Sequence, residues 1–424
     1  MVSFFAIVSS LAQSTASLAQ STVAPPPDQP PAGTATEQGE SPRLGVSTIV
    51  DLEGNIGYSS NPQLIRGGSG QLFGRGSIYV AHARQDARSS TVLSAFGENS
   101  IYSGRAGSQQ LFRATASHTR ALTEKVQIFG NVSASLDRGG QLGNRLIGSP
   151  NAPVPSTPEL IPVFPDNFED LSLIGSTTYR LSGQAGAQVS ISQRDSLSFS
   201  AGADRAMFKG LQSDNDFTGI SGSAAWNRVL SERASAGLSV NVRHSDYQRG
   251  RSSSQINPQV QGRLQIAERL DLSGAIGVSF AQNDDGIDKD NSIGLTFNGS
   301  ICGRRAIETY CARISRDNQS DTIAGPSTSS SFDLSYSRRI DQNQSLQLSA
   351  GASQQSQRFD ESTTLTPIGK QTYLRAAAAY TRTLSPRWLT GLNLAARSLR
   401  RDGADPKPDV SASVFVRWRV GDLR

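Results

Sequence analysis

The chain has 424 residues, a formal net charge of +5 and a hydrophobic content of only 36%. No apolar run approaches the roughly 18–20 residues that a membrane-spanning helix needs, so the composition excludes a helical membrane protein. The positive charges are mostly arginines dispersed along the chain, which argues against a nucleic-acid-binding surface, because such surfaces gather their positive charge.

The N-terminal residues predict export from the cytoplasm. An apolar stretch, Phe4–Val8, is followed by small residues up to Ala19, which fits a signal peptide over residues 1–19. The stretch lacks a positive charge at its start, so a start further upstream and a disordered tail remain alternatives. Residues 20–45 are rich in proline and predict a disordered periplasmic linker. Residues 46–424 are expected to form one domain.

From position 86 onward, a short polar turn recurs about every 37 residues. Each period holds two strands, one tight turn and one looser connection, which is typical of a transmembrane β-barrel rather than of a solenoid or propeller. The clearest copies of the turn are Leu122–Lys125, Gln193–Ser196, Leu230–Arg233, Ala267–Leu270, Ile340–Asn343 and Leu384–Arg387.

Between the turns, apolar and polar residues alternate, so each strand has one apolar and one polar face. One example is the set Ala236, Leu238, Val240 and Val242 against Gly237, Ser239, Asn241 and Arg243. A soluble β-sandwich would also alternate, but its strands would be nearer about five or six residues long. We therefore predict an all-β fold, a transmembrane antiparallel β-barrel.

The connections give the number of strands. Nine long connections and eight tight turns join 18 strands, the first near Ser47–Ser59 and the last near Asp409–Val420. Sixteen strands remain the alternative if the first hairpin is wrongly assigned. An even number places both termini on the periplasmic side, with the short turns. The expected location is the outer membrane of a Gram-negative bacterium.

One connection, from 137 to 170, is much longer than the others and rich in proline. Proline keeps such a segment out of the sheet, and a connection of this length is usually functional or disordered. We predict a gate loop that constricts or caps the pore, with a mobile surface loop as the alternative. The residues expected to form the gate are Pro150, Pro155, Pro158 and Phe164.

Cys302 and Cys311 are the only cysteines and flank one tight turn. They can lie opposite each other on the polar face of the hairpin, and an oxidising periplasm then predicts a disulfide. No histidine lies near them in the sequence, which argues against a metal site.

The alternation places seven arginines on the polar face, toward the lumen. Fixed positive charges in a pore attract anions, and the guanidinium group binds carboxylates in a bidentate manner, which suits an acidic sugar chain. The alternative is that these arginines pair with inward-facing carboxylates such as Asp204, Asp333 and Glu98. The seven predicted anion- or polysaccharide-binding residues are Arg180, Arg243, Arg263, Arg313, Arg375, Arg397 and Arg417.

The sequence contains no recognisable catalytic motif, and we predict neither an enzyme nor a cofactor or metal site. The three histidines, His82, His118 and His244, each fall on an alternating strand. A lipid-hydrolysing barrel would need an outward-facing Ser–His pair, for which His244 is the sole candidate.

The segment Leu52–Pro62 resembles the opening strand of the β-barrel porin 2 family, and Thr178–Gln184 and Arg194–Ser200 are similar to its repeated hairpins. The resemblance implies an outer-membrane channel of the kind found in exopolysaccharide export systems, including sphingan-type systems. Its expected partners are outer-membrane lipid and lipopolysaccharide, a polysaccharide chain, and periplasmic proteins of polysaccharide synthesis or export. Two alternatives stay open: a diffusion porin for small anions or oligosaccharides, and a structural or adhesive barrel with a closed lumen.

Overall fold

The computed structural model describes residues 45–64, 67–104, 106–138, 177–209, 216–284, 289–322, 325–357, 370–401 and 407–421. The predicted signal peptide, nearly all of the linker and the gate residues lie outside these ranges. Within them, no helix is long and apolar enough to span a bilayer.

The described chain forms eighteen strands. Their bounds are β1 Gly45–Ser59, β2 Gln71–Gln85, β3 Ser89–Tyr102, β4 Ser108–Ala121, β5 Val126–Arg138, β6 Thr177–Ser190, β7 Asp195–Lys209, β8 Phe217–Ser231, β9 Ala234–Tyr247, β10 Ser252–Ala267, β11 Leu270–Asp284, β12 Lys289–Arg304, β13 Glu308–Thr322, β14 Gly325–Arg339, β15 Gln344–Gln357, β16 Gln371–Ser385, β17 Trp388–Arg401 and β18 Asp409–Gly421.

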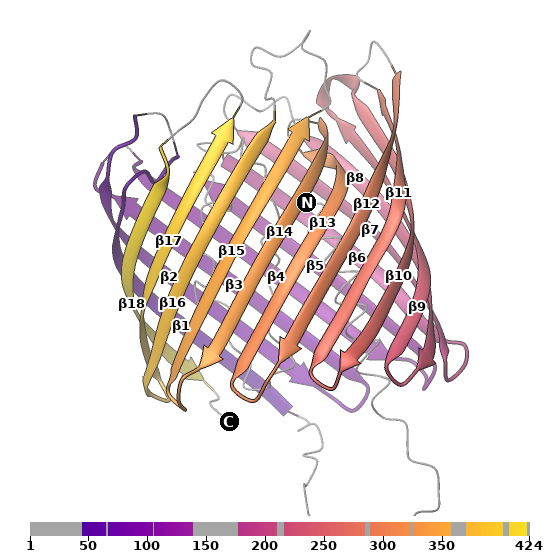
Figure 1. Ribbon diagram of the computed structural model, residues 1–424, viewed down its shortest axis with the longest axis horizontal. Helices are drawn as coiled ribbons and strands as arrows, with labels where there is room; N and C mark the ends of the chain where they lie inside the picture. Colours follow the sequence, from indigo (N-terminus) through magenta and orange to yellow (C-terminus); the bar gives the residue numbers. More distant parts are fainter. Residues whose placement is uncertain are drawn as a thin grey trace, which may run out of the picture.

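The strands form a closed antiparallel barrel. Each strand pairs with its neighbours in the chain, and β18 pairs with β1 to close the wall, with Arg417 opposite Glu53. Figure 1 shows the tilted strands and the tight turns gathered at one end. The predicted fold class and strand number are confirmed, with the first strand starting at Gly45 and the last ending at Gly421.

The outer face of the barrel is apolar. Ile56, Leu238 and Val414 are outward residues with exposed fractions of 75%, 54% and 57%. Aliphatic side chains this exposed along entire strands would be unfavourable in water, whereas a hydrocarbon layer solvates them. A closed barrel also leaves no unpaired strand edge inside a bilayer. The protein therefore belongs in the outer membrane.

A side-chain oxygen at a fixed position closes most of the repeated turns. In the first of them, the Thr123 hydroxyl accepts hydrogen bonds from the backbone N–H groups of Lys125 and Val126, at 3.2 and 3.0 Å. Serine, threonine and aspartate side chains can satisfy turn N–H groups in this way, which explains the recurring turn sequence. The same role is played by Ser192, Ser231, Asp341 and Ser385.

Candidate functional site in the barrel lumen

The inner face of the barrel is rich in hydroxyl groups that pair across neighbouring strands. These pairs hold the hydroxyls in fixed positions along the wall, because each oxygen is both donor and acceptor. Such a surface can form hydrogen bonds with water or with a polar solute. The pairs are Ser94–Thr115, Ser133–Ser182, Ser200–Ser223, Ser273–Ser300 and Ser315–Ser331, with oxygen–oxygen distances between 2.6 and 2.8 Å.

Two of the seven predicted arginines form ion pairs that reach across an intervening strand. Arg243 on β9 donates to Asp204 on β7 at 2.9 Å, and the residue between them on β8 is Gly219. A Cβ atom on Gly219 would lie 2.7 Å from the Asp204 Oδ1 atom and 3.1 Å from the Arg243 Nη2 atom. The absence of a side chain there therefore opens the path for the pair.

The same arrangement recurs on the strands β14, β15 and β16. Arg375 donates to Asp333 at 2.6 Å, and a Cβ atom on the intervening Gly351 would lie 2.4 Å from the Asp333 Oδ1 atom. Each pair neutralises one lumen arginine. For Arg243 and Arg375, the structure therefore favours the alternative prediction, in which inward-facing carboxylates compensate the charge of the arginines.

Two more predicted arginines are paired at the seam where the barrel closes. Arg417 donates to Glu53 at 2.8 Å, and both side chains are 4% exposed. The Arg397 Nε atom donates to Asp409 at 3.1 Å, and Asp409 also accepts from Ser59 at 2.7 Å. These contacts connect β17, β18 and β1.

The remaining three predicted arginines differ in their surroundings. Arg263 pairs with Asp271 at 3.2 Å, with about half of its side chain exposed. Neither Arg180 nor Arg313 has a hydrogen bond or ion pair to a side chain in the part of the chain that the structure describes, and the Nε atom of Arg180 is buried without a partner. These two arginines are the candidates for contact with an anionic solute.

Two lumen ion pairs were not among the predicted site residues. Arg419 contacts both carboxylate oxygens of Asp51 at 2.8 Å, and the Arg75 Nε atom lies 3.5 Å from Glu98. The signal for the first pair is the match of Asp51 and Glu53 on the first strand with Arg417 and Arg419 on the last. The match predicts ion pairs only if the barrel closes, because closure is what makes the first and last strands neighbours.

The outer end of β13 leaves its place in the wall and bends inward over the inner face of β11 and β12. Its pairing with β12 stops at Arg316, although β13 continues to Thr322 and β12 extends to Lys289. Beyond that point β13 pairs with β14 alone among the described residues, and it contacts β9 and β10 on the far side of β11 and β12. The end of the β13–β14 hairpin therefore narrows the pore.

Hydrogen bonds hold this hairpin end against the wall. The side-chain amide of Gln255 on β10 donates to the backbone carbonyl of Asn318 at 2.7 Å and also to the Ser279 hydroxyl at 2.9 Å. The Thr328 hydroxyl on β14 donates to the Asn318 side chain at 2.8 Å. Asn318 lies over Gly294 on β12, where a Cβ atom would be only 2.3 Å from its Nδ2 atom. We call Gln255, Asn318 and Thr328 the hairpin contact.

Cys302 and Cys311 are direct cross-strand partners on β12 and β13, with their Sγ atoms 2.16 Å apart and their Cα atoms 4.1 Å apart. Both lie on the inward side of the hairpin, as the alternation predicts. The disulfide in the native protein stays a prediction for chemistry to test.

All three histidines bond to a hydroxyl on a neighbouring strand. His82 pairs with Thr48 at 3.0 Å and His118 with Thr91 at 2.8 Å. His244 contacts Ser254 at 2.8 Å and Asp246 at 3.1 Å. The histidine–hydroxyl pairing thus recurs at three places on the outward face, and among the described residues only His244 also contacts a carboxylate. No group of three or more potential metal ligands occurs among the described residues.

No family model and no curated protein matches the sequence. Among solved structures, the FrpB iron transporter from Neisseria meningitidis is similar at 8% identity with a TM-score of 0.48. The match covers 83% of this chain and 63% of FrpB, so the chain spans less than two thirds of that protein. Pseudomonas aeruginosa OccK2 (OpdF) and OpdQ are each similar at 10% identity, with TM-scores of 0.46 and 0.43. Each of these two matches covers 89% of this chain and 98% of the other.

The class of the protein follows from its own fold. A closed barrel of eighteen antiparallel strands, apolar outside and polar inside, is an outer-membrane barrel of the porin type.

Proposed function

We propose that the protein is a diffusion channel for small polar solutes, with sugars and short oligosaccharides as the solute class. A barrel of this strand number encloses a lumen wide enough for water. Its wall presents paired hydroxyls and amides, which can replace the hydration of a hydroxyl-rich solute. The observation that carries the proposal is the hairpin contact of Gln255, Asn318 and Thr328, which holds hydrogen-bonding groups over the inner face of the wall.

Because most of the lumen arginines are paired with carboxylates, we expect the pore to select solutes by size and hydrogen bonding more than by charge. Five of the seven predicted arginines form ion pairs with nearby carboxylates: Arg243, Arg263, Arg375, Arg397 and Arg417. Only Arg180 and Arg313 have no ion pair among the described residues, and Arg313 lies opposite Asp333 on β14, so the preference for anions is expected to be weak.

Liposome swelling with neutral sugars of increasing size tests the proposal. Gln255→Ala removes the side-chain donor to Asn318, and one net hydrogen bond is worth about 1 kcal/mol, or roughly a fivefold change in an equilibrium. The variant should therefore admit larger sugars than the wild type does. Gln188→Ala, on the lumen face of β6 and away from the hairpin contact, is the matched control and should keep the wild-type size limit. Wild-type liposomes that do not swell with any sugar would contradict the channel proposal.

Export of an acidic exopolysaccharide, with sphingan-type systems as the expected setting, is the second candidate. It is favoured by Arg180 and Arg313, whose guanidinium groups are available to carboxylates of a passing chain. While the polysaccharide passes, the end of the β13–β14 hairpin would then have to move aside in step with any periplasmic export partner. Deleting the gene and measuring secreted polysaccharide separates the two candidates, because a diffusion channel leaves secretion unchanged. A structural barrel with a closed lumen would show no conductance in planar bilayers.

A further inference from the structure

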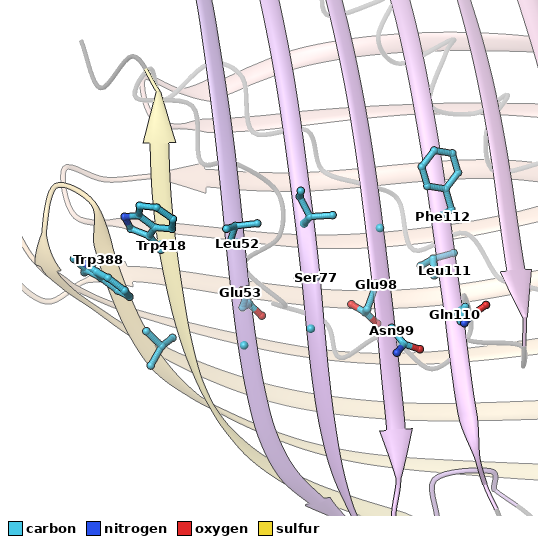
Figure 2. Close-up of a pocket in the computed structure, with 15 residues that line it drawn as sticks. Leu52, Glu53, Ser77, Glu98, Asn99, Gln110, Leu111, Phe112, Trp388 and Trp418 are labelled. Atoms are coloured by element: carbon cyan, nitrogen blue, oxygen red, sulfur yellow. The ribbon is translucent and has the colours of Figure 1, made fainter.

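A hollow lies on the outer, lipid-facing side of the barrel, beside the seam between β18 and β1. Its volume is about 770 Å³, which is within the usual range for small-molecule pockets. Figure 2 shows Leu52, Phe112, Trp388 and Trp418 around it. These side chains are 38–47% exposed. The hollow is thus an apolar depression in the surface that faces the hydrocarbon.

Two glycines make the floor of this hollow. Gly54 on β1 and Gly76 on β2 are cross-strand partners, and an added Cβ atom would meet nothing within 4 Å at either position. Both are on the outward face, because they alternate with Glu53 and Ser77 on the inward face. Outward aliphatic residues line both sides, so the glycines leave a trough between rows of larger side chains.

The trough crosses the strands and runs obliquely between the two ends of the barrel. At one end, Trp388 and Trp418 are stacked at 6.1 Å beside the tight turns. At the other end are Asn99 and Gln110, which are cross-strand partners near the long connections. Four strand spacings separate β18 from β4, or about 19 Å. One lipid tail crosses half of the roughly 30 Å hydrocarbon core, so the trough is long enough for a tail.

The two amides are unusual for this surface. Asn99 and Gln110 are exposed on the outward face, and neither side chain has a hydrogen bond to any residue that the structure describes. An amide that faces hydrocarbon without a hydrogen-bond partner is unfavourable. A carbonyl or hydroxyl of a lipid at this depth would supply the missing partner.

We propose that this trough binds one acyl chain of outer-leaflet lipopolysaccharide. The chain lies over Gly54 and Gly76 and ends against the stacked tryptophans. Asn99 and Gln110 donate hydrogen bonds to the carbonyl group that links the acyl chain to the sugar. A second copy of the barrel is a poorer occupant, because two convex walls touch along their raised residues and leave a depression between them unfilled. Unfilled space forfeits dispersion contacts.

Native mass spectrometry of the barrel extracted in mild detergent tests the proposal. Wild-type protein should retain one lipopolysaccharide molecule. A Gly54→Leu/Gly76→Leu double variant fills the trough and should lower retention at least tenfold. Gly183→Leu is the control, since Gly183 also faces outward, on β6, and an added Cβ there would meet its nearest atoms at an ordinary 3.9 Å. This control should retain lipid as the wild type does.

The Asn99→Ala/Gln110→Ala double variant removes the amide donors but leaves the trough open. It should lower the retention of lipopolysaccharide by a smaller factor than filling the trough does. Heat-modifiable migration and unchanged sugar flux establish that each variant folds. Equal lipid retention by the filled variant and the wild type would overturn the proposal. So would a wild-type barrel that retains phospholipid instead, or one that purifies as a dimer which filling of the trough dissociates.

Discussion

Replacing Asp204 with asparagine should turn a nearly neutral stretch of the lumen into an anion-selective one. Asp204 accepts a hydrogen bond from Arg243 at 2.9 Å, and their side chains are only 2% and 9% exposed. Asparagine has the same shape and keeps an oxygen acceptor for the guanidinium group. The substitution therefore changes the charge of the lumen by +1 with little change in its form.

The size of the effect follows from Coulomb's law. A unit charge about 8 Å from the ion path has an energy of about 0.5 kcal/mol in water, opposite in sign for anions and cations. The permeability ratio of anion to cation should then rise about fivefold without screening, about fourfold at 0.01 M salt and about twofold at 0.1 M salt. The dependence on salt is itself part of the prediction.

Reversal potentials across planar bilayers with a salt gradient measure this ratio. Gly219→Val is the informative control, because a side chain there enters the space between Asp204 and Arg243 and separates the pair without changing any charge. That variant should keep the wild-type ratio. An Asp204→Asn/Arg243→Gln double variant should also return to it. Unchanged reversal potentials for Asp204→Asn at 0.01 M salt would refute the assignment of this pair to the ion path.

Three further outcomes are expected. Alkylation of unreduced protein should leave Cys302 and Cys311 unlabelled, and labelling of both thiols would contradict the disulfide. A fluorophosphonate probe should leave Ser254 unmodified, as judged by intact mass, because its contact with a histidine repeats a structural pairing found elsewhere on the outer face. Gly294→Val should displace Asn318 and raise single-channel conductance, and a conductance equal to that of the wild type would argue against the inward position of the hairpin end.

The strand number could be predicted from the sequence because each strand carries its own signal. The period-two alternation sets which face meets lipid, and a side-chain oxygen such as that of Thr123 closes most of the turns. Ion pairs such as Arg375–Asp333 could not be predicted in the same way. They depend on a glycine in a third strand, Gly351, and on cross-strand register, neither of which the alternation within one strand contains. The alternation correctly indicates that an arginine faces inward, but not what compensates its charge.

The inward position of the β13 end has a physical explanation in the outward residues of that strand. Outward positions on β13 are apolar from Tyr310 to Ile314 and then become Arg316 and Asn318. A charged or amide side chain in contact with lipid is costly, so leaving the wall spares Arg316 and Asn318 that contact. The strand leaves β12 where the apolar face ends and places its polar groups in the lumen. Polar outward residues alone do not have this effect, because β11 ends in the outward residues Gln282 and Asp284 and stays paired with β12. On β13 the polar residues begin earlier, at Arg316, and the resulting narrowing of the pore does not depend on the proline-rich insert.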